Sequence, residues 1–125
     1  MTAGRIRVTI AALSALLALG CAALAVGHAG VNVPLLSRIG PGGDRAVVPA
    51  AIAFTFATVI LAAVAWGTRR GRPWAWAVGF VVHAWVFVGA AYPFRGVASL
   101  VALVIAGTCL ALLITPAGRR ALVAR

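Results

Sequence analysis

The stretch Trp74–Tyr92 most constrains the fold of this chain, because nineteen consecutive residues there include no Asp, Glu, Lys or Arg. A helix needs about 20 mostly apolar residues to cross the ~30 Å hydrocarbon core of a bilayer. Aromatic rings, which favour the membrane surface, mark both ends, with Trp76 near the first and Tyr92 at the last. The arginine-rich turn Arg69–Arg72 comes just before it. The stretch is therefore predicted to be a transmembrane helix.

Three other apolar runs complete a set of four predicted spans. The spans cover residues 8–29, 47–66, 74–92 and 97–115. The last two connections are so short that they favour helical hairpins, and the prolines fall at or near helix ends or in loops. The sequence thus predicts an all-α fold in which residues 1–125 form one membrane domain, an antiparallel up-down-up-down four-helix bundle. Pro116 is expected to stop the last helix and leave a basic tail.

Composition supports the membrane class. The chain is 64% hydrophobic and only 10% charged, whereas soluble domains are about a quarter charged. Its formal net charge of +10 would suit nucleic acid if the arginines shared one face or one helix. They lie instead in the gaps between apolar runs, as the positive-inside rule requires, so nucleic-acid binding is not expected. The bilayer is the predicted surrounding.

The arginines also predict an orientation. Those assigned to the cytoplasmic side are Arg5, Arg7, Arg69, Arg70, Arg72, Arg119, Arg120 and Arg125, and those on the other side are Arg38, Arg45 and Arg95. Because cytoplasmic loops carry the excess of positive charge, both termini are expected to be cytoplasmic. The predicted location is the bacterial plasma (inner) membrane.

Two alternatives remain open for the first run. A basic start followed by an apolar run also begins a signal peptide, and small residues near Ala25 could form a cleavage site. Gly20-Cys21 could end a lipoprotein signal. The run is longer than the 7–15 residues typical of a signal peptide, which favours a retained span. The connection 30–46, rich in glycine and apolar residues, is expected to lie in the membrane interface.

His83 is the one intramembrane polar residue that suggests a functional site, since ionisable side chains in spans are rare and often functional. It could relay a proton, bind a ligand, or ligate haem together with His28. The favoured interpretation is a neutral histidine hydrogen-bonded within the protein or to a partner. The candidate intramolecular acceptors and donors are Thr55, Thr58, Ser99 and Thr108.

No pattern of residues indicates an enzyme, a cofactor or a metal. The sequence holds one carboxylate side chain, Asp44, so no carboxylate pair for acid–base catalysis can form. Its serines lack a neighbouring base in sequence, and no phosphate-binding glycine loop precedes a helix. Cys21 and Cys109 form no CxxC or Cys/His motif and are expected to be free thiols.

Small residues predict how the helices pack. Ala98, Ala102 and Ala106 recur every four residues, a spacing that lets helix backbones approach closely in lipid. This alanine ridge is expected to pack inside the bundle, against a matching surface on the first span. That surface comprises Ala11, Ala15, Ala18 and Ala22. Trp85 and its neighbours would then face outward.

Two segments carry a resemblance to a group of proteins. They are Gly71-Arg72-Pro73-Trp74-Ala75 before the third span and Leu112-Leu113-Ile114-Thr115-Pro116-Ala117-Gly118-Arg119-Arg120 after the fourth. With this layout the chain resembles small four-span integral membrane proteins of actinobacteria that have no assigned function. We expect a non-catalytic accessory or structural subunit that binds a membrane partner or a second copy of itself. The alternative is a small carrier for an apolar or cationic solute.

Overall fold

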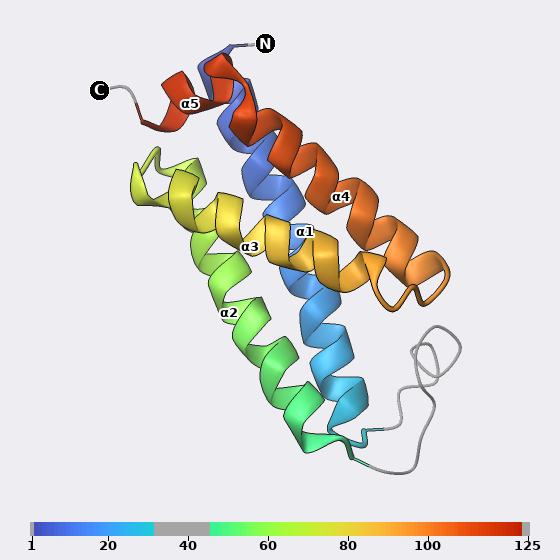
Figure 1. The fold of residues 1–125 in the computed structure, drawn as a ribbon. Helices are drawn as coiled ribbons and strands as arrows, with labels where there is room; N and C mark the ends of the chain where they lie inside the picture. The colour runs from blue at the N-terminus through green and yellow to red at the C-terminus, as the bar shows by residue number, and fades with distance from the viewer. Residues whose placement is uncertain (1, 32–45, 124–125) are drawn as a thin grey trace.

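The computed structural model describes residues 2–31 and 46–123, and in this part the chain is all-helical. Its five helices are α1 (Ala3–His28), α2 (Val48–Arg69), α3 (Trp74–Ala91), α4 (Val97–Ile114) and α5 (Pro116–Leu122) (Figure 1). The first four are long and apolar enough to cross a membrane. The expectation of an all-helical chain with four such stretches is confirmed.

Local signals account for the helix ends. Thr2 caps α1 by accepting a hydrogen bond from the Arg5 N–H at 3.4 Å, so this helix begins five residues before the predicted span. Pro49 lies in the first turn of α2, where its missing N–H costs nothing. The expected interfacial position of the 30–46 connection concerns residues 32–45, which lie outside the described part. Its two flanks meet, because the Val47 N–H donates to the His28 carbonyl at 2.8 Å.

The segment after Pro116 differs from the predicted tail. Pro116 starts a new helix, α5, with Thr115 as its N-cap: the Thr115 hydroxyl accepts a hydrogen bond from the Gly118 N–H at 3.0 Å. Proline ends the preceding helix and also fits the first position of the next, because its φ angle is already helical. Leu122 on α5 is buried. The short helix therefore folds back onto the protein.

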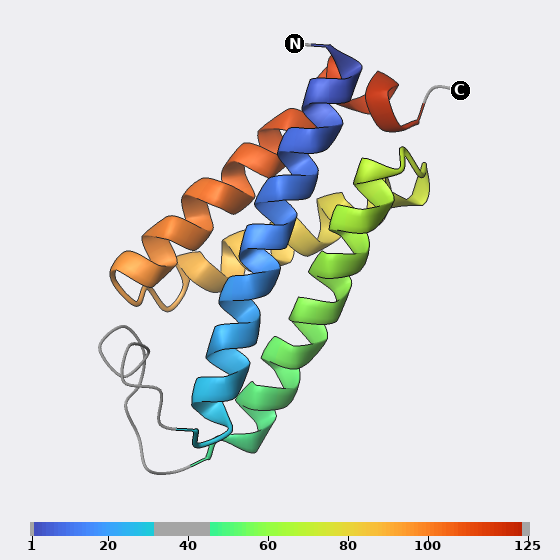
Figure 2. The ribbon, with the colours of Figure 1, turned by 180° about the vertical axis from the view of Figure 1, so that it is seen from behind.

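The helices pack in neighbouring pairs around two apolar clusters. Figures 1 and 2 show α1 alongside α2, and α3 alongside α4, with both chain ends and the α2–α3 turn at one end of the molecule. The central cluster comprises Leu17, Ala18, Leu61, Val82, Ile105 and Ala106. The terminal cluster, near the chain ends, comprises Ile6, Ile10, Leu113 and Leu122. In this second cluster, Leu122 of α5 packs with Ile6 and Ile10 of α1.

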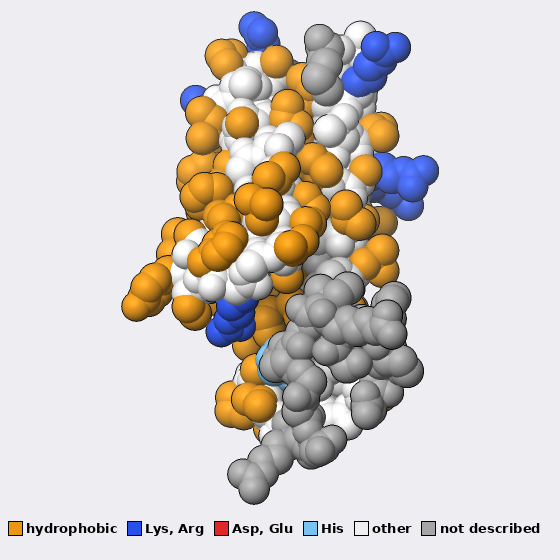
Figure 3. All heavy atoms as spheres, turned by 90° about the vertical axis from the view of Figure 1, so that its right-hand side faces the viewer, with side chains coloured by type: hydrophobic (Ala, Val, Ile, Leu, Met, Phe, Trp, Pro, Cys, Tyr) orange, Lys and Arg blue, Asp and Glu red, His pale blue; other side chains and the backbone are white. Residues whose placement is uncertain are grey.

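The outer surface is apolar along its sides. Figure 3 shows hydrophobic side chains over most of one face of the helices, with arginines near their ends. Such continuous apolar surface is far larger than soluble monomers expose, and lipid is the solvent that suits it. The distribution supports assignment of the four long helices to a membrane.

Candidate functional site

Three fully buried polar side chains from three different helices meet inside the protein. His83 on α3, Ser14 on α1 and Cys109 on α4 are each 0% exposed. The Ser14 hydroxyl lies 3.2 Å from His83 Nε2. The Cys109 thiol lies beside the same hydroxyl. We call these three residues the polar cluster.

The hydrogen-bond partners assign the protons of the polar cluster. His83 Nδ1 lies 2.6 Å from the Gly79 carbonyl, which can only accept, so Nδ1 carries a hydrogen. In a neutral ring Nε2 is then the acceptor, and the Ser14 O–H donates to it. The Ser14 hydroxyl and both ring nitrogens of His83 thus have a partner, as burial in a medium without water requires.

Gly79 determines how closely α3 approaches its neighbours. A Cβ at this position would stand 3.2 Å from Val64 Cγ1 on α2 and 3.7 Å from Leu113 Cδ1 on α4. The absence of a side chain therefore brings one turn of α3 against both helices. His83 follows one turn later on the same face, which directs its ring into the interior.

The partner of His83 is a correction to the sequence analysis. None of the four predicted partners bonds to it. Thr55, Thr58 and Thr108 donate to the carbonyls four residues earlier in their own helices, and Ser99 accepts from the Arg95 N–H at 2.9 Å. Hydroxyls in apolar helices commonly return to the backbone in this way. Ser14, which the sequence analysis considered only as a nucleophile without a base, is the residue that contacts the imidazole.

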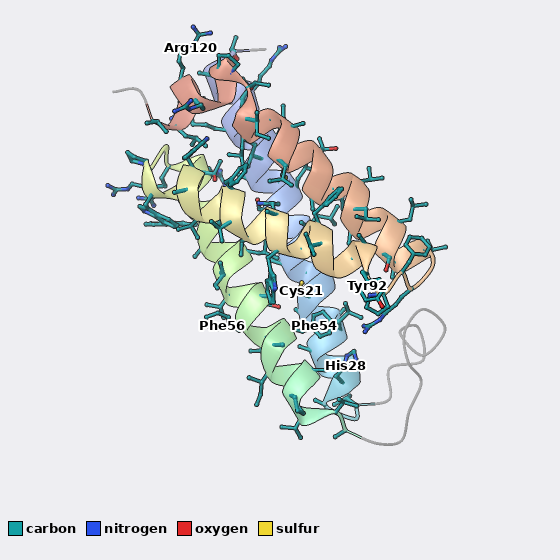
Figure 4. All side chains as sticks on the ribbon, viewed as in Figure 1. Cys21, His28, Phe54, Phe56, Tyr92 and Arg120 are labelled. Carbon is teal, nitrogen blue, oxygen red and sulfur yellow. The ribbon has the colours of Figure 1, made fainter. Side chains whose placement is uncertain are left out.

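The two histidines lie far apart. Ser14 marks the depth of His83 on α1, and His28 is fourteen residues further along, roughly 21 Å at 1.5 Å per residue. His28 Nδ1 donates to the Leu24 carbonyl at 2.7 Å, and its ring packs 5.2 Å from that of Phe54 (Figure 4). A haem ligated by both histidines does not fit this placement.

Both cysteines are free thiols, as predicted. Cys109 belongs to the polar cluster, whereas Cys21 is half-buried on α1, beyond Ser14. Within residues 2–31 and 46–123, no group of three or more His, Cys, Asp or Glu side chains is placed to hold a metal ion. The polar cluster itself contains an imidazole, a hydroxyl and a thiol but no carboxylate.

The alanine ridge faces inward to different degrees along α4. Ala106 is 0% exposed and belongs to the central cluster with Ala18, while Ala102 is half-buried against the same cluster. Ala98, near the start of the helix, is half-buried. On the first helix the expected matching surface is only partly correct, because Ala15 is exposed.

The arginines chosen from sequence gather near the chain ends. Arg5 and Arg7 lie in the first turns of α1, Arg69 ends α2, Arg70 and Arg72 lie in the α2–α3 turn, and Arg119 and Arg120 lie on α5. Two of the guanidinium groups rest on indole rings: that of Arg70 lies 5.2 Å from the Trp66 ring centre, and that of Arg119 lies 5.5 Å from the Trp76 ring centre. Figure 4 labels Arg120 at this end. Arg125, which was assigned to the same side, and Arg38 and Arg45, which were assigned to the other side, lie outside the described residues.

An open apolar groove runs between α2 and α3 on the outside of the protein. Its volume is about 520 Å³, and the residues that line it are Pro49, Ile52, Ala53, Phe56, Ile60, Val81, Val82 and Trp85. Trp85 is 55% exposed. The Trp76 indole N–H donates to the Leu113 carbonyl at 2.9 Å, whereas that of Trp85 has no such acceptor among the described residues.

Comparisons with known proteins define no family. No protein-family model, no curated protein and no solved structure matches the chain. Functional inference therefore depends on the polar cluster, the groove and the distribution of charge.

Proposed function

We propose that this protein is an accessory or structural subunit of a complex in the bacterial plasma membrane, without a catalytic role of its own. In this proposal the four long helices form an antiparallel up-down-up-down bundle with both termini in the cytoplasm. The proposal extends the resemblance to small four-span actinobacterial membrane proteins. A transmembrane helix of a larger partner would occupy the α2–α3 groove.

The outward position of Trp85 is the observation that carries this proposal. Tryptophan favours the membrane surface, where its N–H reaches water or headgroups. Trp85 lies twelve residues into the eighteen-residue α3, away from both ends, and faces outward beside the groove. An indole N–H in hydrocarbon costs free energy unless it finds an acceptor. A partner helix with a hydroxyl or carbonyl at that depth would supply one.

The sealed polar cluster weighs against the carrier alternative. Carriers place polar groups along a path that opens to each side of the membrane. His83 and Ser14 are fully buried and bonded to one another. The outer groove is lined by apolar residues.

Topology gives a first test. We expect cysteine at Val123 to react with a membrane-impermeant maleimide only after cell lysis, and cysteine at Phe94 to react in intact cells. Both side chains are exposed, and the proposal places them on opposite sides of the membrane. The background would carry alanine at Cys21 and Cys109. Labelling of Val123→Cys in intact cells would contradict the proposed orientation.

The groove gives a second test. A photo-crosslinking amino acid at Trp85 should join the protein to one specific membrane protein in cells that express it at native level. The same amino acid at Val104, which is exposed on α4, is the matched control and should yield lipid adducts only. Equal protein crosslinking from both positions, or none from either, would refute a partner at the groove. Loss of uptake of a defined solute in a stably folded His83 variant would instead favour the carrier.

A further inference from the structure

An arginine of α1, Arg7, contacts the α2–α3 turn at Gly71. Gly71 has a φ angle of +65°, and a Cβ there would stand 2.5 Å from Arg7 Nη1. The Arg7 guanidinium of α1 thus lies directly on the turn that carries Arg70 and Arg72. Arg7, distant in sequence, therefore adds its positive charge to a turn that already carries two arginines.

No carboxylate accompanies these charges in the part of the chain that the structure describes. The sequence has a single acidic side chain, Asp44, which falls outside those residues. Like-charged guanidinium groups at one end of a protein repel each other, and the repulsion grows where low-dielectric hydrocarbon lies nearby. An anion that bridges them converts this repulsion into attraction. Arginine suits phosphate in particular, because its planar fork donates two parallel hydrogen bonds.

The surroundings indicate where the anion comes from. The terminal cluster lies at the same end of the helices: Ile6 precedes Arg7 in sequence, and half-buried Trp76 packs against the cluster. The Arg119 guanidinium lies over the Trp76 ring. Charges held above an apolar surface at the end of membrane-spanning helices match a phospholipid, whose phosphate lies next to its acyl chains.

We propose that Arg7 and the turn Arg70–Arg72 form a headgroup site for an anionic phospholipid of the phosphatidylglycerol type. The phosphate lies between the Arg7 guanidinium and the turn, and the acyl chains descend along the apolar outer surface of the helices. The site anchors this end of the protein in the leaflet that is richer in anionic lipid. The proposal is independent of the α2–α3 groove and of any partner protein.

The test measures lipid binding to the purified full-length protein in a neutral detergent. Fluorescent phosphatidylglycerol and phosphatidylcholine would be titrated separately. We expect phosphatidylglycerol to bind more tightly, and Arg7→Gln and Arg72→Gln each to weaken it about fivefold, the effect of one arginine near an anionic surface. Arg95→Gln is the matched control, because this arginine lies in the α3–α4 turn, and it should leave the affinity unchanged.

Each other outcome overturns the proposal. Equal affinity for the two lipids would show that the site does not select the headgroup. Equal losses of affinity in all three variants would show that binding depends only on net charge. Inorganic phosphate that competes at the same concentration as the lipid would assign the arginines to a soluble anion. Arg72 is exposed, so Arg72→Gln decides the matter if Arg7→Gln does not fold.

Discussion

Replacement of Ala106 by phenylalanine should destabilise the protein by about 1–3 kcal/mol, the usual cost of overpacking a filled core. Ala106 is 0% exposed and lies in the central cluster with Leu17, Val82 and Ile105. In lipid the hydrophobic effect contributes little to helix association, so close packing supplies the attraction. A ring at position 106 would force α4 away from α1 and α3.

The measurement is the unfolding free energy in mixed micelles, and Val104→Phe is the matched control. Val104 lies on the same helix but is 61% exposed, so a larger side chain there meets only detergent or lipid. We expect Val104→Phe to change stability by less than about 0.5 kcal/mol. Equal destabilisation by the two variants would mean that α4 has no distinct inner face. A neutral Ala106→Phe would show that the ridge does not pack as described.

The extent of the helices could be predicted because hydrocarbon imposes strong local rules. A helix must satisfy its own backbone and must be long enough to cross, so uncharged runs of about 20 residues and their flanking arginines suffice. The inward position of Ala106 followed from the spacing of small residues alone. The outward position of Trp85 followed by elimination, since the alanine ridge of the fourth span was expected to pack against the first span.

The α5 helix was missed although its signal is present in the sequence. Thr115 directly before Pro116 is a standard start, with an N-cap hydroxyl followed by a first-turn proline. The sequence analysis gave Pro116 only its role as a terminator. Thr115 and Pro116 end α4 as well as start α5, because the Thr115 N–H still bonds back to the Ala111 carbonyl at 3.3 Å.

The partner of His83 could not be obtained from sequence in the same way. It depends on the tilt and rotation of three helices, which local patterns do not determine. A partial signal exists on α1, where Ser14 lies four residues after Ile10 and three before Leu17, on the buried stripe of the helix. A hydroxyl among buried apolar positions is a better candidate than the threonines, which the backbone of their own helices satisfies.

The hydrogen bond between His83 and Ser14 should be measurable as a coupling energy. His83→Leu leaves the Ser14 hydroxyl without its acceptor inside the protein, which costs about 1–3 kcal/mol for a buried group. Ser14→Ala should cost less, because the imidazole keeps its bond to the Gly79 carbonyl. The double variant should recover part of the loss, with a coupling of about 0.6–1.7 kcal/mol, the range found for hydrogen bonds between membrane helices.

Unfolding free energies of the four proteins in one detergent provide the cycle, and Thr108→Val is the matched control because its hydroxyl bonds within α4. Thr108→Val combined with His83→Leu should be additive. Additivity of His83→Leu with Ser14→Ala as well would contradict the assigned bond, and the polar cluster would then have to be held together by the packing around Gly79 alone.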